Sequence, residues 1–284
     1  MQFDSRLVRY LTCIGLLSTA ALAPAQVVIP PATAQVNTLR TLALDHVEPS
    51  SGYVEAGVLY HTLTAGYPDW RGVFLRGGWR SDAKNYWTGE LVRSQQFDDQ
   101  GTLGVIGNTH VINDLWYSTV SVSGSTGGFY LPEFRIDASL SRKWFERRNF
   151  VTTAGITAIN ANDGHKDKSL LLAAAYYFES PFVLEGGIRL NNSNPGSVRS
   201  NAQYVALTYG VAGNQIMSLR YGFGEEAYQY ITPDALLVNF NSYIWTGTWR
   251  KWVTPKQGFQ VRAEAYHNSY YDRQGIELSV FQEF

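Results

Sequence analysis

From about Gly52 to its last residue, the chain repeats one pattern in which every second residue is apolar. In 135–141, Ile136, Ala138 and Leu140 alternate with charged and hydroxylated residues. A period of two is typical of a β-strand whose two faces meet different surroundings. We identify fourteen such segments, at 53–63, 70–80, 85–97, 101–112, 115–124, 134–145, 150–161, 168–179, 181–192, 200–212, 214–225, 236–252, 257–268 and 273–284. The sequence therefore predicts an all-β protein.

The length of these segments separates two kinds of all-β protein. Most segments span ten to thirteen residues, whereas strands of globular proteins average roughly five or six. A tilted strand needs roughly nine to eleven residues to cross a bilayer. We therefore expect a transmembrane antiparallel up-and-down β-barrel of about fourteen strands in the bacterial outer membrane. The pattern is less clear at 101–124 and 168–192, so twelve strands is also compatible with it.

The composition excludes several other classes of protein. Charged residues make up 17%, and 23 Lys and Arg nearly balance 24 Asp and Glu. No excess of positive charge therefore points to nucleic acid. After residue 25 no apolar run approaches the roughly 18 residues of a spanning helix, which excludes a helical membrane protein.

The N-terminal residues resemble an export signal. Arg6 and Arg9 precede an apolar stretch at 11–22, and Ala23-Pro24-Ala25 offers the small residues of a cleavage site. We expect a signal peptide at 1–25, rather than an anchor helix, because the apolar stretch is short. A proline-containing periplasmic linker at 26–51 and the barrel at 52–284 would follow. Cys13 is the single cysteine, so the mature chain would lack disulfides.

The turns and the aromatic residues predict how the barrel is oriented. Links after even-numbered segments are short, and most links after odd-numbered segments are longer, as in outer-membrane barrels with short periplasmic turns. Aromatic residues cluster beside the short links and predict a periplasmic girdle. They are Trp79, Tyr86, Trp87, Trp116, Tyr117, Trp144, Phe145, Phe150, Tyr177, Phe178, Phe182, Trp249, Trp252 and Phe259.

The last strand carries two expectations. A terminal aromatic residue, Phe284, ends an alternating strand, and we expect it to be read by the barrel-assembly machinery. An open sheet edge cannot persist in hydrocarbon, because each unpaired backbone group costs several kcal/mol. The last strand should therefore pair with the first.

The alternation also assigns residues to the lumen. The predicted lining residues are Glu55, Arg76, Arg80, Glu90, Asp137, Glu185, Arg189, Arg220, Arg262, Glu264 and Glu277, together with Arg135 and Lys143. Six acids against seven bases give no single sign of charge, as a strongly selective pore would have. Either the charges pair and fill a structural barrel, or they border a water-filled path for a neutral or mixed solute.

A catalytic site is not expected. No two of the five histidines have metal-ligand spacing, so neither a metal nor a cofactor is predicted. His267 with Ser269 is the nearest candidate for a hydrolase of the lipid-facing surface, and a polar pair at the rim explains these residues better.

Several stretches resemble the YaiO family of outer-membrane β-barrels. They are Gly66-Tyr67-Pro68-Asp69-Trp70 after the first strand, Leu131-Pro132-Glu133-Phe134-Arg135 in the middle, and Tyr271-Asp272-Arg273-Gln274-Gly275-Ile276 leading to Phe281-Gln282-Glu283-Phe284. The resemblance covers roughly residues 50–284. It implies a surface-exposed barrel in contact with outer-membrane lipid and supplies no catalytic residues.

Two hypotheses about function follow. In the first, the barrel is a porin-like transport channel that exports an exopolysaccharide, with or without a periplasmic export partner, and Tyr53, Tyr86, Tyr266 and Phe281 stack on sugar rings. In the second, the barrel transports nothing, and its external loops at 125–133, 193–199 and 226–235 bind a partner. The run Tyr228-Gln229-Tyr230-Ile231 would suit such recognition.

Overall fold

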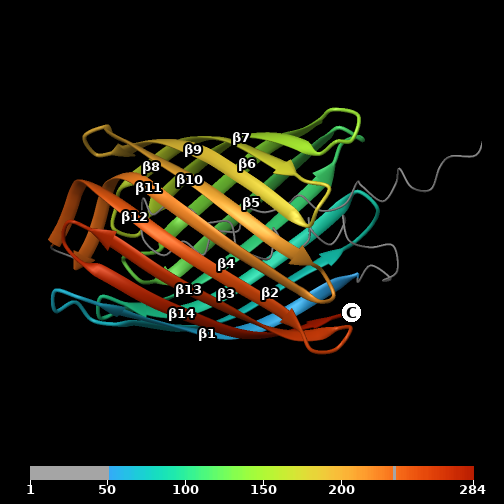
Figure 1. Ribbon diagram of the computed structural model, residues 1–284. Helices are drawn as coiled ribbons and strands as arrows, with labels where there is room; N and C mark the ends of the chain where they lie inside the picture. Colours follow the sequence, from blue (N-terminus) through green and yellow to red (C-terminus); the bar gives the residue numbers. More distant parts are fainter. Residues whose placement is uncertain (1–50, 233–234) are drawn as a thin grey trace, which may run out of the picture.

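The computed structural model describes residues 51–232 and 235–284, and in them fourteen strands form one closed antiparallel barrel (Figure 1). The predicted signal peptide and residues 26–50 of the predicted linker lie outside the described residues. The strands are β1 (Gly52–Leu63), β2 (Trp70–Arg80), β3 (Asn85–Gln96), β4 (Asp99–Val111), β5 (Trp116–Gly127), β6 (Pro132–Trp144), β7 (Phe150–Ala161), β8 (Lys166–Tyr177), β9 (Phe182–Asn194), β10 (Val198–Val211), β11 (Gln215–Thr232), β12 (Ala235–Trp252), β13 (Gln257–Asn268) and β14 (Asp272–Glu283).

The first and last strands close the cylinder, as predicted. β1 pairs with β14 from Tyr53↔Glu283 to Leu63↔Arg273 without interruption. At the end of the seam the Gly52 N–H donates to the Phe284 carbonyl over 3.1 Å, and the Phe284 N–H donates back over 3.0 Å. Both ends of the barrel segment therefore lie together, at the end that we call periplasmic (right in Figure 1).

The two faces of the wall differ as the period of two requires. Large apolar side chains such as Val58, Leu75, Leu91, Ile156 and Val280 point outward and are 52, 54, 54, 64 and 66% exposed. Charged and hydroxylated side chains occupy the alternate positions and are buried inside. No helix among the described residues is long and apolar enough to cross a membrane. The exposed apolar side chains of the outward face form the belt that meets lipid.

The predicted difference in link length is wrong. The links after odd-numbered strands include 97–98, 128–131 and 195–197, and those after even-numbered strands include 81–84 and 145–149. Polar segments that the sequence suggested as loops continue the hydrogen-bonded ladders instead. β11 and β12 are the longest strands, with 18 residues each, and they project at the end opposite the chain terminus, which we call the external end (Figure 1).

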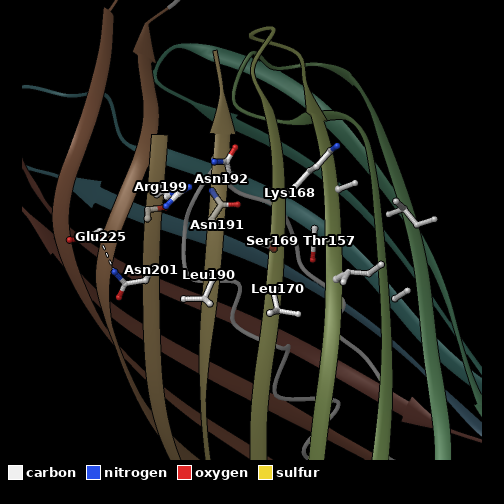
Figure 2. Close-up of a pocket in the computed structure, with 15 residues that line it drawn as sticks. Thr157, Lys168, Ser169, Leu170, Leu190, Asn191, Asn192, Arg199, Asn201 and Glu225 are labelled. Atoms are coloured by element: carbon white, nitrogen blue, oxygen red, sulfur yellow. Dashed lines mark hydrogen bonds between the residues drawn. The ribbon is translucent and has the colours of Figure 1, made fainter. Parts of the chain in front are cut away.

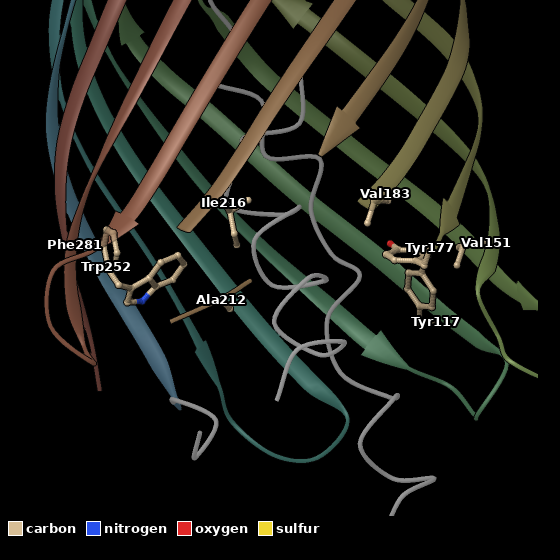
Figure 3. Close-up of a cluster of buried hydrophobic side chains, with 8 residues drawn as sticks. All are labelled: Tyr117, Val151, Tyr177, Val183, Ala212, Ile216, Trp252 and Phe281. Atoms are coloured by element: carbon tan, nitrogen blue, oxygen red, sulfur yellow. The ribbon is translucent and has the colours of Figure 1, made fainter. Parts of the chain in front are cut away.

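The predicted aromatic girdle divides between the two faces of the wall. Trp79, Trp144, Phe178, Phe182 and Trp249 point outward and are 36 to 43% exposed, as a girdle requires. Other predicted members face inward and are buried. Tyr117, Tyr177 and Trp252 join Val151, Val183, Ala212, Ile216 and Phe281 in an inner apolar ring at the periplasmic end (Figure 3). Neighbours in sequence have opposite orientations in a strand, so one aromatic cluster supplies both surfaces.

The outward belt allows a test of the membrane placement. We expect Leu75→Arg, at the middle of β2, to lower the free energy of unfolding by about 2–4 kcal/mol, because a charge at the bilayer midplane is poorly solvated. Ile112→Arg, in a periplasmic turn, should cost only about 0–1 kcal/mol. Urea unfolding in lipid vesicles measures both values. Equal costs at the two positions would contradict the placement.

Candidate functional site

One wall of the lumen carries a continuous network of opposite charges. Arg76 lies at its centre: its Nε donates to Glu90 Oε1 over 2.6 Å, and its NH2 donates to Glu277 Oε2 over 3.4 Å. Glu277 also accepts from Arg262 over 3.3 Å, and Arg262 donates to Glu264 over 3.1 Å. Residues from β2, β3, β13 and β14 are thereby joined into one ion-paired group.

Glu55 anchors one end of this network. Its Oε2 accepts from Arg250 NH1 over 2.7 Å, and its Oε1 lies 3.7 Å from Arg76 NH1. Ser279 Oγ donates to the same Oε1 over 2.9 Å. Glu55 is only 1% exposed and Arg250 also only 1%. At the other end of the network, Arg273 donates to Glu264 over 2.5 Å.

The opposite wall, on β4 to β8, is lined mainly by small hydroxylated side chains. Thr109 and Thr119 are 3.2 Å apart at their hydroxyls, and Ser141 and Thr153 are 2.8 Å apart. Ser121 and Ser123 share the same face and are likewise buried. These side chains extend only a few bonds from the backbone, whereas the Arg and Glu side chains of the first wall reach far into the lumen.

Two cations that have no carboxylate partner among the described residues lie where this wall continues into β9 and β11. Arg189 NH1 donates to Thr157 and Ser169 hydroxyls over 2.9 and 2.6 Å. The Arg220 guanidinium lies 3.5 Å from the centroid of the Tyr204 ring, and the Tyr204 hydroxyl donates to Glu185 over 2.6 Å. Asp137 is held by Arg135 over 2.7 Å. Bases therefore exceed acids locally, although the predicted lumen set as a whole is nearly balanced.

Aromatic side chains converge at the external end of the lumen. We call this group the external aromatic cluster: Tyr67, Trp70, Phe97, Phe129 and Tyr271, with Ile231, Leu237, Phe240, Ile244, Tyr266 and Leu63 around them. The Phe97 ring is central, with its centroid 5.1 Å from that of Trp70, 6.0 Å from Tyr67 and 6.3 Å from Tyr271. The cluster joins β2 to loops from several hairpins at this end of the lumen.

The turn between β3 and β4 directs Phe97 inward. Phe97 and Asp98 have φ angles of 50° and 63°. Positive φ at both positions of a two-residue turn matches the right-handed twist of the adjoining strands, although bulky residues seldom adopt it. Asp99, next in the chain, accepts the Phe129 N–H over 2.7 Å. The backbone conformation and this bond together hold Phe97 and Phe129 against each other.

The segment predicted to bind a partner does not form an open loop. Residues up to Thr232 belong to β11, and Tyr228, Gln229 and Ile231 are 8, 0 and 9% exposed. Tyr228 donates to the Pro195 carbonyl over 2.5 Å, and Gln229 bonds to Tyr271. These residues hold the external end together, and their exposure does not suit the recognition predicted for them.

In the polar pair considered for a hydrolase, His267 and Ser269, the histidine contacts a carboxylate. His267 Nδ1 lies 2.5 Å from Asp272 Oδ1, and its ring packs on Tyr243 with centroids 4.7 Å apart. Ser269 lies exposed in the link 269–271. Among the described residues no group of three or more His, Cys, Asp or Glu side chains could hold a metal ion.

The predicted lumen residues all lie on the inner face. Six of them, Glu55, Arg76, Glu90, Arg262, Glu264 and Glu277, share the ion-paired network, and Arg80 lies half-buried at the periplasmic end of β2. Sequence analysis missed Arg250 and Arg273. Arg273 has the phase of Glu277, so extending the alternation by four residues would have found it. No sequence signal marked Phe97.

Comparisons with solved structures match this fold. The CymD monoaromatic hydrocarbon channel superposes with a TM-score of 0.56 at 8% identity, covering 88% of this chain and 91% of that one. The toluene transporter TodX of P. putida gives 0.52 at 10% identity, with coverage of 84% and 91%. The anion-selective porin of Comamonas acidovorans gives 0.49 at 9% identity, with coverage of 82% and 98%. Among curated proteins none matches the chain.

Fold, lumen and belt define the class: this is a β-barrel of the bacterial outer membrane whose fold resembles those of outer-membrane channels. Residues 51–229 match the YaiO membrane beta barrel domain, so the chain belongs to that family. The resemblance noted from the sequence motifs is thereby confirmed.

The ion-paired network makes a stability prediction. Glu55→Gln leaves Arg250 buried without its carboxylate and removes one of the three carboxylates around Arg76, and we expect it to lower the free energy of unfolding by about 3–5 kcal/mol. The control is Arg147→Gln, which removes the exposed ion pair with Glu179 and should cost less than about 1 kcal/mol. Urea unfolding in vesicles measures both. A neutral effect of Glu55→Gln would show that the network is not stabilising.

A histidine at the external end makes a pH prediction. His165, in the link before β8, contacts Asp163, and its Nε2 lies 3.4 Å from Asp167 Oδ2. Burial by itself lowers the pKa of His165, but hydrogen bonds and charge interactions with the two aspartates outweigh it and raise the pKa to about 9. Since the unfolded pKa is about 6.5, this stabilisation is complete below that pH and is lost as pH rises through 9.

We therefore expect the wild-type barrel to lose up to about 3 kcal/mol of unfolding free energy between pH 6 and pH 10 relative to His165→Asn. The variant lacks the titrating imidazole, so the contributions of all other titrating groups to the pH dependence cancel when the two proteins are compared. Unfolding curves at the two pH values provide the measurement. Parallel pH dependence in the two proteins would show that the charged His165 does not stabilise the fold.

Proposed function

We propose that the barrel is a channel for polar, neutral glycans, closed at its external end by the external aromatic cluster. The observation that supports this most is the contrast between the two lumen walls. Small hydroxyls such as Thr119, Ser121 and Ser123 line one wall, and a network of paired charges lines the other. A path along the hydroxyl wall offers hydrogen bonds to sugar hydroxyls and runs apart from the paired charges of the other wall.

Aromatic residues add to this proposal. Tyr53, Tyr86, Tyr266 and Phe281 are buried on the inner face as expected from the alternation, and their rings are of the kind that sugar rings stack on. CymD and TodX, whose folds are similar, are described as a monoaromatic hydrocarbon channel and a toluene transporter. The charges and hydroxyls inside this barrel favour a polar solute over such apolar ones. Export of an exopolysaccharide is the physiological role that we infer.

Current measurements in planar bilayers test the closure. We expect Phe97→Ala to raise the channel current several-fold over that of the wild type, because it removes the central ring of the external aromatic cluster. The control is Phe145→Ala, since Phe145 also has a positive φ, 64°, but lies in a periplasmic turn and is 68% exposed. Absence of current in both the wild type and Phe97→Ala would refute a channel.

Flux measurements in the Phe97→Ala background test the path itself. Ser121→Trp should slow the entry of neutral oligosaccharides into liposomes, because it fills the hydroxyl wall. Val120→Trp is the matched control, since Val120 is the adjacent outward residue and 45% exposed. Equal flux through both variants would place the path elsewhere.

A further inference from the structure

The outer face of the barrel has a hollow near its external end. It has a volume of about 730 Å³ and lies over β6 to β11, on the side that meets the membrane (Figure 2). Alanines line it on two strands, at Ala138 and Ala158, where much of the belt carries larger apolar residues. The missing side-chain volume explains why the surface is recessed here.

The residues of the hollow are ordered by height. Ile156, Leu170 and Leu190 are partners across β7, β8 and β9 and are 64, 41 and 45% exposed. A second row lies two residues nearer the external end. In this row Lys168 of β8 pairs with Asn192 of β9, and Asn192 pairs with Arg199 of β10. Since a strand rises roughly 3.3 Å per residue, about 7 Å separates an apolar row from a polar row with a cation at each side.

The charges of the polar row suit an anion. Neither Lys168 nor Arg199 has an ion-pair partner among the described residues, and both are exposed. Adjacent strands lie about 4.8 Å apart, so the Cα atoms of these two cations are roughly 10 Å from each other, within joint reach of one headgroup. The carboxylate in the hollow, Glu225, accepts from Asn201 over 2.8 Å (Figure 2). Two free cations therefore face one hydrogen-bonded acid.

We propose that this hollow binds a phosphorylated glycolipid of the outer leaflet. Its acyl chains would lie on Ile156, Leu170 and Leu190, and its phosphates would be bound by Lys168 and Arg199. Asn201 and Glu225 can bond to the sugar hydroxyls of the headgroup. The apolar row is continuous with the lipid-facing belt, so an amphiphile fits the whole hollow, whereas a free phosphate would use only its upper edge. This proposal does not depend on channel activity.

Native mass spectrometry of the purified protein in a neutral detergent tests the site, with diphosphoryl lipid A as the probe. We expect the double variant K168Q/R199Q to weaken binding about tenfold, because it removes two charge-assisted contacts. The matched control is R71Q/R93Q: both arginines are exposed on the outer face toward the external end, bonded to Gln95 and Gln100 rather than to acids, and both lie outside the hollow. Its affinity should equal that of the wild type.

Two further measurements separate the parts of the proposal. Lipid A without its phosphates should bind the wild type as weakly as diphosphoryl lipid A binds K168Q/R199Q. Ala158→Trp, which fills the hollow without changing charge, should also weaken binding while the barrel remains heat-modifiable on gels. Three results would each overturn the proposed site. The first is that R71Q/R93Q loses as much affinity as K168Q/R199Q, and the second is that the wild type binds the phosphate-free lipid as tightly as diphosphoryl lipid A. The third is that Ala158→Trp binds diphosphoryl lipid A as tightly as the wild type does.

Discussion

Backbone hydrogen bonding between β1 and β14 is the constraint on which the rest of the structure depends. Hydrocarbon offers no partner to a free N–H or C=O group, so a sheet in a bilayer persists only when its edges meet. Here the two edges join through an unbroken register from Tyr53↔Glu283 to Leu63↔Arg273. Closure brings together residues more than 200 positions apart in sequence and creates an inside and an outside.

That division accounts for the chemistry of both surfaces. Outward positions can be apolar because lipid covers them, and inward positions can be charged because closure brings opposite charges together. Glu55 of β1 meets Arg250 of β12 and Ser279 of β14, and Arg76 of β2 meets Glu277 of β14. Pairing and hydrogen bonding offset the cost of burying these charges. The network is therefore a consequence of closure, and its ion pairs also connect strands on the two sides of the seam.

The two ends and the outer face adapt this common architecture. The external aromatic cluster packs at one end of the lumen, and the inner apolar ring gives the other end an apolar lining. On the outside, alanines on β6 and β7 leave a hollow in the belt, which is also lined by two cations without an ion pair among the described residues. The barrel fold is thus similar to that of other outer-membrane channels, whereas the proposed glycan path and the proposed lipid site depend on side chains particular to this chain.

The sequence by itself determined the fold class, a strand number of about fourteen, the face of nearly every residue and the seam between the first and last strands. These follow from local alternation and from the absence of water in a bilayer, and both can be recognised without coordinates. Six of the predicted lumen charges belong to one network, yet alternation could state only that they face inward. Which acid meets which base depends on register and side-chain reach across strands.

Only the tertiary structure decided the remaining features. The polar segment before Thr232 continues as a strand because a neighbouring strand satisfies its backbone, a long-range contact that composition does not reveal. The aromatic residues near the turns divide between lipid and lumen because strand phase, not ring chemistry, sets their direction. Phe97 turns inward through a local positive φ, and the hollow at Ala158 exists because Ala158 of β7 and Ala138 of β6 lie diagonally across the register of the two strands.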